Sequence, residues 1–304
     1  MKKFIFRLSL AICPFAFALG TLLRIVYQSE LDVLKHDLTC PTNILAAVVG
    51  DSRVETYFDP EEIPWLRNFG QSATPFTVTA HKAKLIAELN PHLKLVIIDI
   101  WPDQFFSNID KPYGPGVPDG IALIEMMTRE GMAPLGDGFD VRVVKGVLVP
   151  GLENLMAEGR RKGQITGGFM KNHKFIKDGY FCVECAHAIP FWPKKTPIEL
   201  PHVTPTGCEI VLDRLLRDLS QKNINVILTT TPLLWYEPRY TKEAREYFER
   251  RMAEIASRHG VHWYNWMNDY QPNTNYWSDV NHLNDIGAKI FSRDKRIILG
   301  QYLK

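Results

Sequence analysis

The sequence predicts an α/β fold in which a parallel sheet of five strands lies between two layers of helices. After about residue 42, short apolar runs alternate with amphipathic helical patterns, and the apolar runs are continuous. Continuous apolar runs are typical of strands that are buried on both faces, as in a parallel sheet covered by helices. Alternation of strand and helix also favours right-handed crossovers. We therefore expect a three-layer α/β/α sandwich.

Each element of this sandwich has its own signal. The expected strands are NILAAVVG (43–50), WLRNFGQ (65–71), LKLVIIDI (93–100), NVILTTTP (225–232) and VHWYNWM (261–267). Helical patterns cover 75–91, 205–223, 240–260 and 283–303. Most apolar residues of the second pattern fall on one helix face, namely Ile210, Leu212, Leu215, Leu216 and Leu219. Gly260 stands where a C-cap is expected to end the third.

One stretch interrupts the alternation. Residues from about 101 to 203 are rich in proline and glycine and contain only short periodic pieces. A structureless loop of this length is uncommon inside a compact domain. We therefore expect an inserted subdomain on the rim of the sheet, where it would shape the substrate site.

The first 27 residues predict an export segment. Lys2, Lys3 and Arg7 precede an uncharged stretch at 8–23. A buried N-terminal helix of a soluble protein is one alternative. The two export alternatives are an uncleaved signal anchor, or a signal peptide cleaved after Ala16-Phe17-Ala18.

Either export alternative sends the rest of the chain across a membrane, because the positive residues stay in the cytoplasm. Residues 28–42 are then a linker, and 43–304 form the folded domain that contains the insertion. We expect this domain to be anchored on the periplasmic side or at the cell surface, or to be secreted after cleavage.

Overall charge and the lack of nucleotide motifs narrow the range of partners. Lysine and arginine number 36 against 34 acidic residues, a net charge of +2, so the charge balance does not predict nucleic acid as a partner. The sequence has no GxGxxG or GxxxxGKS loop. No cofactor is expected.

The cysteines leave several alternatives. Cys182 and Cys185 form a CxxC pair, with His173, His187 and Cys208 near it in sequence. Zinc binding is one interpretation, but a single CxxC with this histidine spacing fits no common zinc finger, so no metal is expected. Disulfides or buried thiols are favoured, and the pairing of the four cysteines after the export segment stays open: Cys40, Cys182, Cys185 and Cys208.

Ser52 follows the first predicted strand in the turn GDSR. Ligands of open parallel sheets bind outside the carboxyl ends of the strands. A short helix beginning at this serine would offer free amides to a negatively charged oxygen. Aspartate and serine are also ordinary turn and N-cap residues, so this motif alone does not define a nucleophile.

A second polar motif lies near the C-terminus, in NYWSDVNHLNDIGAKIF (275–291). Asp279 and His282 are three residues apart, which lets a carboxylate and an imidazole approach each other. A hydroxyl nucleophile needs a base, and the base needs an acid to orient it. Ser52, Asp279 and His282 supply this set, although a solvated turn at the entry to a helix would have a similar composition.

These motifs resemble those of the SGNH, or GDSL-like, hydrolases and acyltransferases. The resemblance rests on VVGDSR at the first strand, RNFGQSA (67–73) at the second, and DVNHLNDIGA (279–288). It covers most of the chain after residue 42 and excludes the export segment and the insertion. It implies the flavodoxin-like sandwich of this family, in a divergent, membrane-anchored member.

The resemblance also implies roles for individual residues. Ser52 would attack an ester carbonyl, His282 would take the serine proton, and Asp279 would fix the imidazole tautomer. The backbone amides of Ser52 and Gly70 would bind the oxyanion.

The chain departs from the family pattern in two places. The family's third block carries an asparagine that donates to the oxyanion, whereas this chain reads IIDIWPDQFF (97–106). Gln104 is then the candidate for an amide that contacts the oxyanion or the substrate. Arg53 replaces the leucine or small residue that often follows the serine, and we expect it to affect packing more than chemistry.

The expected function is therefore a serine-dependent O-acyl ester hydrolase or O-acetyltransferase that acts on a cell-envelope or extracellular carbohydrate. Its expected partners are an acylated glycan or small ester and a membrane acyl-export protein. The alternative is a non-catalytic envelope protein that binds glycan or docks a partner, with a vestigial triad. Four tryptophans would either stack on sugars or pack in the core: Trp101, Trp192, Trp235 and Trp277.

Overall fold

A computed structural model describes the sheet domain of this chain. The described residues are 32, 35–71, 74, 76–106, 205–233, 240–270, 273–278 and 281–304. All helices and strands named below belong to one compact unit.

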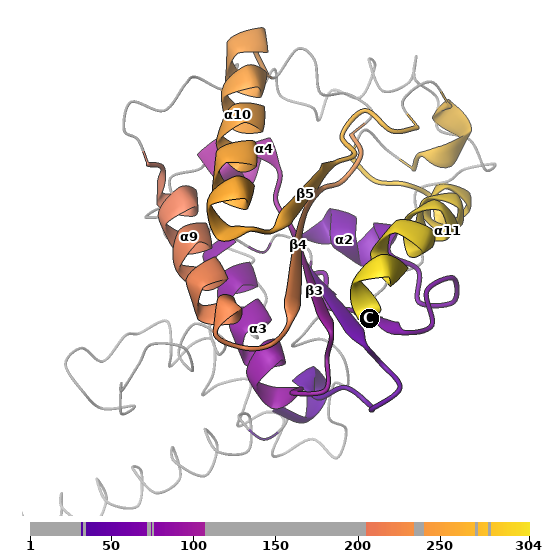
Figure 1. Ribbon diagram of the computed structural model, residues 1–304. Coiled ribbons are helices and arrows are strands. Elements are labelled where there is room, and N and C mark those ends of the chain that lie inside the picture. The colour runs from indigo at the N-terminus through magenta and orange to yellow at the C-terminus, as the bar shows by residue number, and fades with distance from the viewer. Residues whose placement is uncertain are drawn as a thin grey trace, which may run out of the picture. The chain divides into compact units, whose positions relative to one another are not determined.

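The centre of this unit is a parallel five-stranded sheet in the order β2-β1-β3-β4-β5 (Figure 1). The strands are β1 (Ala46–Val49), β2 (Leu66–Asn68), β3 (Leu95–Asp99), β4 (Asn225–Thr230) and β5 (His262–Asn265). The sequence thus predicted the fold class correctly, and the order is the doubly wound 2-1-3-4-5 of flavodoxin-like folds. In this order, ligands bind where β1 and β3 lead to opposite faces of the sheet.

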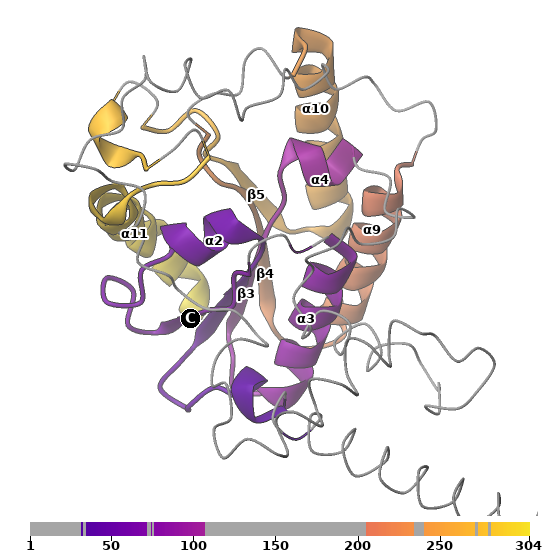
Figure 2. The same ribbon diagram turned by 180° about the vertical axis from the view of Figure 1, so that it is seen from behind.

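Helices cover both faces of the sheet, as Figures 1 and 2 show. One layer contains α3 (Phe76–Leu89), α9 (Gly207–Ser220) and α10 (Lys242–His259), with the short α4 (Pro102–Phe106) beside them. The other contains α2 (Ser52–Tyr57) and α11 (Asp285–Gly300). Two 3-10 turns, Thr274–Tyr276 and Gln301–Leu303, flank α11. The three predicted layers are confirmed.

Capping residues define the start of α9 and the end of α10. Gly260 ends α10 in the left-handed conformation at φ 64°. Thr206 and Glu209 form a capping box at the start of α9. Four of the five predicted apolar positions of α9 are buried, but Ile210 is 48% exposed because it lies on the side of the helix opposite the buried leucines.

Two predicted boundaries need correction. The linker was expected to extend to residue 42, but Leu38 and Cys40 are already buried in the sheet domain. The side chain of Asn90 donates to the Leu38 carbonyl at 2.8 Å and accepts from the Cys40 amide at 2.5 Å. Both ends of the Asn90 amide therefore fix this segment.

The insertion was expected to begin at about residue 101, but α4 belongs to the sheet domain. Phe105 is fully buried, and its ring packs edge-on against Phe248 of α10 at 5.2 Å. The rest of the predicted insertion, 107–203, lies outside the described residues, so its expected rim subdomain stays a prediction.

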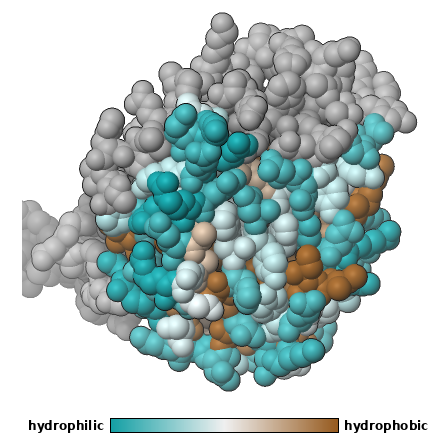
Figure 3. All heavy atoms as spheres, turned by 45° about the horizontal axis from the view of Figure 1, so that its top comes forward, coloured by the Kyte–Doolittle hydropathy of each residue, from teal (hydrophilic) through white to brown (hydrophobic). Residues whose placement is uncertain are grey.

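The surface of the described part is mainly hydrophilic on the face in Figure 3, with apolar residues in small, separate groups. Among the described residues, the exposed large hydrophobic side chains are Ile210, Ile286 and Ile297. Within the described residues, no helix is both long and apolar enough to span a membrane. The expected export segment at 1–27 lies outside these residues.

Candidate active site

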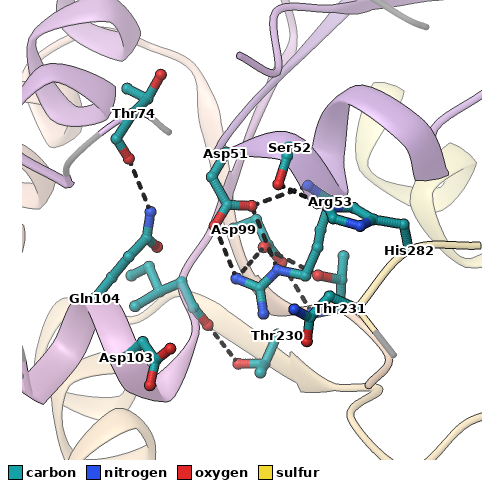
Figure 4. A network of polar contacts seen from close by, with 12 residues as sticks. Asp51, Ser52, Arg53, Thr74, Asp99, Asp103, Gln104, Thr230, Thr231 and His282 are labelled. Atoms are coloured by element: carbon teal, nitrogen blue, oxygen red, sulfur yellow. Dashed lines mark hydrogen bonds and ion pairs between the residues drawn. The ribbon is translucent and has the colours of Figure 1, made fainter. Parts of the chain in front are cut away.

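The structure brings two of the three predicted triad residues into contact. Ser52 is the first residue of α2, directly after β1, and His282 precedes α11. The Nε2 atom of His282 lies 2.8 Å from the Ser52 hydroxyl oxygen, although the residues are 230 positions apart (Figure 4). This distance is a hydrogen bond between a hydroxyl and the side chain expected to act as its base.

The turn before Ser52 is tight because a helix begins immediately at the end of the strand. A Cβ atom on Gly50 would lie 2.3 Å from Cγ2 of Val54 and 3.1 Å from Cβ of Asp99. Glycine therefore lets α2 begin close to β1 and β3. Asp51 caps α2, since its carboxylate accepts from the Arg53 amide at 3.0 Å.

The loop that carries His282 is held by neutral hydrogen bonds. The amide and hydroxyl of Ser278 both donate to the His282 carbonyl, at 2.9 and 3.0 Å. Trp277 and Leu283 pair as an isolated antiparallel bridge. The Tyr57 hydroxyl of α2 donates to the Asn281 carbonyl at 2.6 Å, so the helix that begins at Ser52 contacts the loop that carries His282.

Asn284 joins this loop to α11. Its side-chain oxygen accepts from the first-turn amides of Ile286 and Gly287, and its side-chain amide donates to the Asn275 carbonyl at 2.7 Å. The close fit continues at Gly287, where a Cβ atom would lie 2.2 Å from the Tyr276 carbonyl oxygen.

Asp279, the expected orienting acid, lies outside the described residues. Ser278 and His282, which flank it in sequence, are described and joined by the two hydrogen bonds above. The role of Asp279 stays a prediction.

Arg53 lies in a buried charge cluster beside Ser52 (Figure 4). Its Nε and Nη2 atoms donate to the two oxygens of Asp51, at 3.3 and 3.1 Å. Nη2 is also 3.9 Å from Asp99, and the guanidinium lies 3.7 Å above the Trp101 ring. The sequence predicted a packing role for Arg53, but the structure gives it an ionic one as well.

Asp99 connects this cluster to the loop after β4. It accepts from the Thr229 hydroxyl at 3.0 Å, the Thr231 amide at 2.9 Å and the Thr231 hydroxyl at 3.1 Å. Burial raises the pKa of Asp99 to about 6, against the opposing effect of Arg53. Burial alone would lower the pKa of Arg53, but the two carboxylates outweigh it and raise that pKa. The sequence signal for Asp99 was a carboxylate closing the apolar run LKLVIIDI.

The structure does not support the expected role of Gly70 in an oxyanion hole. Its amide donates to the side-chain oxygen of Asn68 at 2.7 Å, and the Asn68 amide donates to the carbonyls of Val54 and Phe58. A Cβ atom on Gly70 would lie 2.2 Å from the backbone nitrogen of Glu55. Glycine is needed here because the loop after β2 packs directly on the backbone of α2.

Gln104 also departs from expectation. Its Nε2 atom donates to the Thr74 carbonyl at 3.3 Å, and Figure 4 shows its amide directed toward Thr74 and away from Ser52. The Ser52 amide is the remaining predicted donor. As the first residue of α2 it has no acceptor within the helix, and no acceptor for it is found elsewhere among the described residues.

Lys82 of α3 is a buried cation that no sequence motif singles out. Its ammonium donates to the Phe69 carbonyl at 3.2 Å and to the Gln71 side-chain oxygen at 2.7 Å. Burial lowers the pKa of Lys82 to about 7, with Glu55 acting in the opposite direction. The backbone amide of Gln71 donates to the Gly50 carbonyl at 3.1 Å, so the loop after β2 is fixed to the turn that carries Ser52.

Of the remaining candidate residues, some are buried and pack in the sheet domain, and the others lie outside the described residues. Trp277 is fully buried in the core, so it packs and does not stack on a sugar, and Trp101 lies under Arg53. Cys40 and Cys208 are buried free thiols whose pKa values burial raises. Trp192, Trp235 and the Cys182–Cys185 pair lie outside the described residues. Among the described residues, no cluster of three histidines, cysteines or carboxylates could hold a metal.

Comparison with protein-family models and with curated protein sequences finds no match to this chain. The functional interpretation therefore depends on its own residues and fold.

Proposed function

We propose that this protein is a serine-dependent O-acyl ester hydrolase or O-acyltransferase that forms an acyl-enzyme at Ser52. The observation that carries the proposal is the 2.8 Å contact between the Ser52 hydroxyl and His282 Nε2. It lies beside the end of β1, next to β3. This is the strand pair where ligands bind in doubly wound sheets.

The contact suits nucleophilic catalysis. His282 Nε2 accepts the Ser52 proton as the serine oxygen attacks the ester carbonyl, and a tetrahedral intermediate forms. His282 then protonates the leaving alcohol, which departs and leaves the acyl group on Ser52. In the second half-reaction, water or an acceptor hydroxyl attacks this ester while His282 removes its proton. The bond between the acyl carbon and Ser52 Oγ then breaks, and His282 returns the proton to Oγ as the acid or the new ester leaves. The proposed role of Asp279 is to hold the imidazole in the tautomer that accepts at Nε2.

The Ser52 amide is the proposed donor to the oxyanion of the intermediate. It begins α2, where N–H groups without helical partners favour negative charge. One such donor contributes about 3 kcal/mol to transition-state stabilisation. The amide of Gly70 and the side chain of Gln104 are left out of this role because both bind other groups.

For the substrate, we propose an O-acylated carbohydrate of the cell envelope, with acetyl as the acyl group. The N-terminal sequence supports this, because its basic residues and apolar run are typical of a segment that exports or anchors the following domain. A membrane protein that exports acyl groups would be the partner of a transferase, whereas a hydrolase would need none.

The proposal is tested by p-nitrophenyl acetate turnover with the full chain. Ser52→Ala and His282→Ala should each abolish turnover while the thermal unfolding midpoint changes little. Ser220→Ala is the matched control, since this exposed serine ends α9 and bonds only to the Arg217 carbonyl. Equal turnover by wild type and Ser52→Ala would reject the proposal. Added oligosaccharide acceptors would then separate transfer from hydrolysis by their products.

A non-catalytic glycan-binding protein is the second candidate. The observation that favours it is the engagement of Gly70 and Gln104 by other groups, which leaves one predicted oxyanion donor. It predicts that Ser52→Ala retains glycan binding and that wild type hydrolyses no ester above the rate of the Ser52→Ala protein.

A further inference from the structure

We propose that Arg53 is a positioning residue, which fixes the Ser52 turn on the end of β3 and so sets the contact between Ser52 and His282. The inference rests on the proposed function for the roles of these two residues. It concerns how the nucleophile is held and does not depend on the identity of the acyl group or the glycan.

The first observation is that an ion pair links the two neighbours of Ser52 in the chain. Asp51 accepts three hydrogen bonds from Arg53: from its backbone amide at 3.0 Å, from Nε at 3.3 Å and from Nη2 at 3.1 Å. Side-chain and backbone contacts therefore close a small ring around Ser52. A rotation of the Ser52 backbone would break several of these contacts at once.

The second observation is that the same guanidinium contacts a different strand. Nη2 lies 3.9 Å from Asp99 at the end of β3 (Figure 4). The guanidinium also stacks 3.7 Å above Trp101. Asp99 is in turn fixed by the amide and hydroxyl of Thr231, at 2.9 and 3.1 Å. The nucleophile turn is thus attached to β3 and to the loop after β4.

The third observation is burial. Arg53 and Asp99 are each 1% exposed, and Asp51 is 7% exposed. A guanidinium enclosed between two carboxylates interacts with them much more strongly than it would on the surface. Loss of Arg53 leaves two buried carboxylates close to each other, and their repulsion favours movement of the Asp51–Ser52 turn.

Arginine suits this position better than lysine. Its planar fork donates to both oxygens of Asp51 while its face covers Trp101. A lysine would keep the positive charge but lose the paired donors and the stacking. The inference therefore predicts a graded series in which Arg53→Lys is impaired and Arg53→Met is impaired more.

The test measures Ser52 reactivity in the full chain, with a fluorophosphonate inactivation rate and with kcat and KM for p-nitrophenyl acetate. We expect Arg53→Met to lower kcat and the inactivation rate about 100-fold, the loss typical of a misplacement near 1 Å, with KM nearly unchanged. Arg53→Lys should lose about 10-fold by the same argument. Arg53→Met/Asp99→Asn should recover part of the loss, because it removes one of the two repelling carboxylates.

Arg67→Met is the matched control. Arg67 also stacks on an aromatic ring, that of Phe69 at 4.9 Å, and donates to the Thr39 carbonyl, but it lies outside the charge cluster. It should keep wild-type kcat. A folded Arg53→Lys protein with wild-type kcat and a wild-type inactivation rate would overturn the inference. If Arg53→Met fails to fold, the Arg53→Lys protein alone provides the test. Failure of the proposed function would look different from failure of this inference: the Ser52→Ala protein would then turn over substrate and react with the probe like wild type.

Discussion

The two loops that carry the reacting side chains are held in different ways. The Ser52 turn is fixed by buried charges, with Arg53 between Asp51 and Asp99. The His282 loop is fixed by neutral hydrogen bonds to backbone carbonyls, from Ser278 and the Asn284 amide. Loss of one member of a charged cluster leaves an uncompensated charge, whereas loss of one neutral donor costs about 1 kcal/mol. We therefore expect a larger loss of stability from substitutions in the charge cluster at Ser52 than from removal of one neutral donor in the His282 loop.

The strongest test of the comparison removes the group where the two loops meet. His282→Ala should lower kcat for p-nitrophenyl acetate by about 10⁴-fold or more, because Ser52 loses its base. The free energy of unfolding of this variant should stay close to that of wild type, because the backbone carbonyl of residue 282 keeps its hydrogen bonds from Ser278. Turnover near the wild-type rate would mean that the 2.8 Å contact is not catalytic.

The next largest effect is expected from the charged loop. Arg53→Met should lower the free energy of unfolding by about 3–5 kcal/mol at pH 7, because two buried carboxylates lose their partner. Urea unfolding measures this loss. Arg53→Met/Asp99→Asn should be more stable than Arg53→Met alone, and a double variant with the summed losses would contradict the interaction between Arg53 and Asp99.

The pH dependence of the free energy of unfolding tests whether a titrating carboxylate, Asp99, helps to hold the Ser52 turn. The pKa of Asp99 is raised to about 6 by burial, against about 3.9 for an unfolded aspartate. Between these values the folded protein keeps a proton that the unfolded chain has lost. Stability should therefore fall as pH rises from about 4 to 6, by about 3 kcal/mol at most. Asp99→Asn should flatten this slope, and parallel curves for wild type and variant would refute the assignment.

The smallest effect is expected at the neutral loop. Asn284→Ala removes the cap of α11 and the bond to the Asn275 carbonyl, and should lower the free energy of unfolding by about 1–2 kcal/mol. We also expect a several-fold loss of kcat, since the loop before α11 loosens. Thr241→Ala removes a comparable cap from α10 and is the control. It should cost similar stability but leave kcat unchanged; an equal loss of kcat in both variants would show that the effect is not local to the His282 loop.

The sequence was informative where one local property decides the structure. Continuous apolar runs such as LKLVIIDI identified the buried strands, and the polar residues after them located Ser52 and His282 at one edge of the sheet. The proline- and glycine-rich composition after Trp101 concealed α4, because that helix has only five residues and little periodicity.

Properties that depend on contacts between distant residues could not be predicted in this way. The sequence indicated Gly70 as a candidate oxyanion donor. It could not show that the Gly70 amide donates to the side-chain oxygen of Asn68, or that the backbone of α2 lies against Gly70. Lys82 looks like an ordinary surface cation in sequence, and Arg53 was expected only to affect packing. Their burial follows from the elements that cover them. Burial lowers the pKa of Lys82, whereas the two neighbouring carboxylates raise the pKa of Arg53.

The central claim, that Ser52 is a nucleophile activated by His282, is tested most directly by mapping a covalent label. The full chain is treated with a fluorophosphonate probe, digested and analysed by mass spectrometry. The account predicts one labelled peptide, modified at Ser52, with labelling abolished in Ser52→Ala and strongly slowed in His282→Ala. An unlabelled wild-type protein, or equal labelling of wild type and Ser52→Ala, would contradict it.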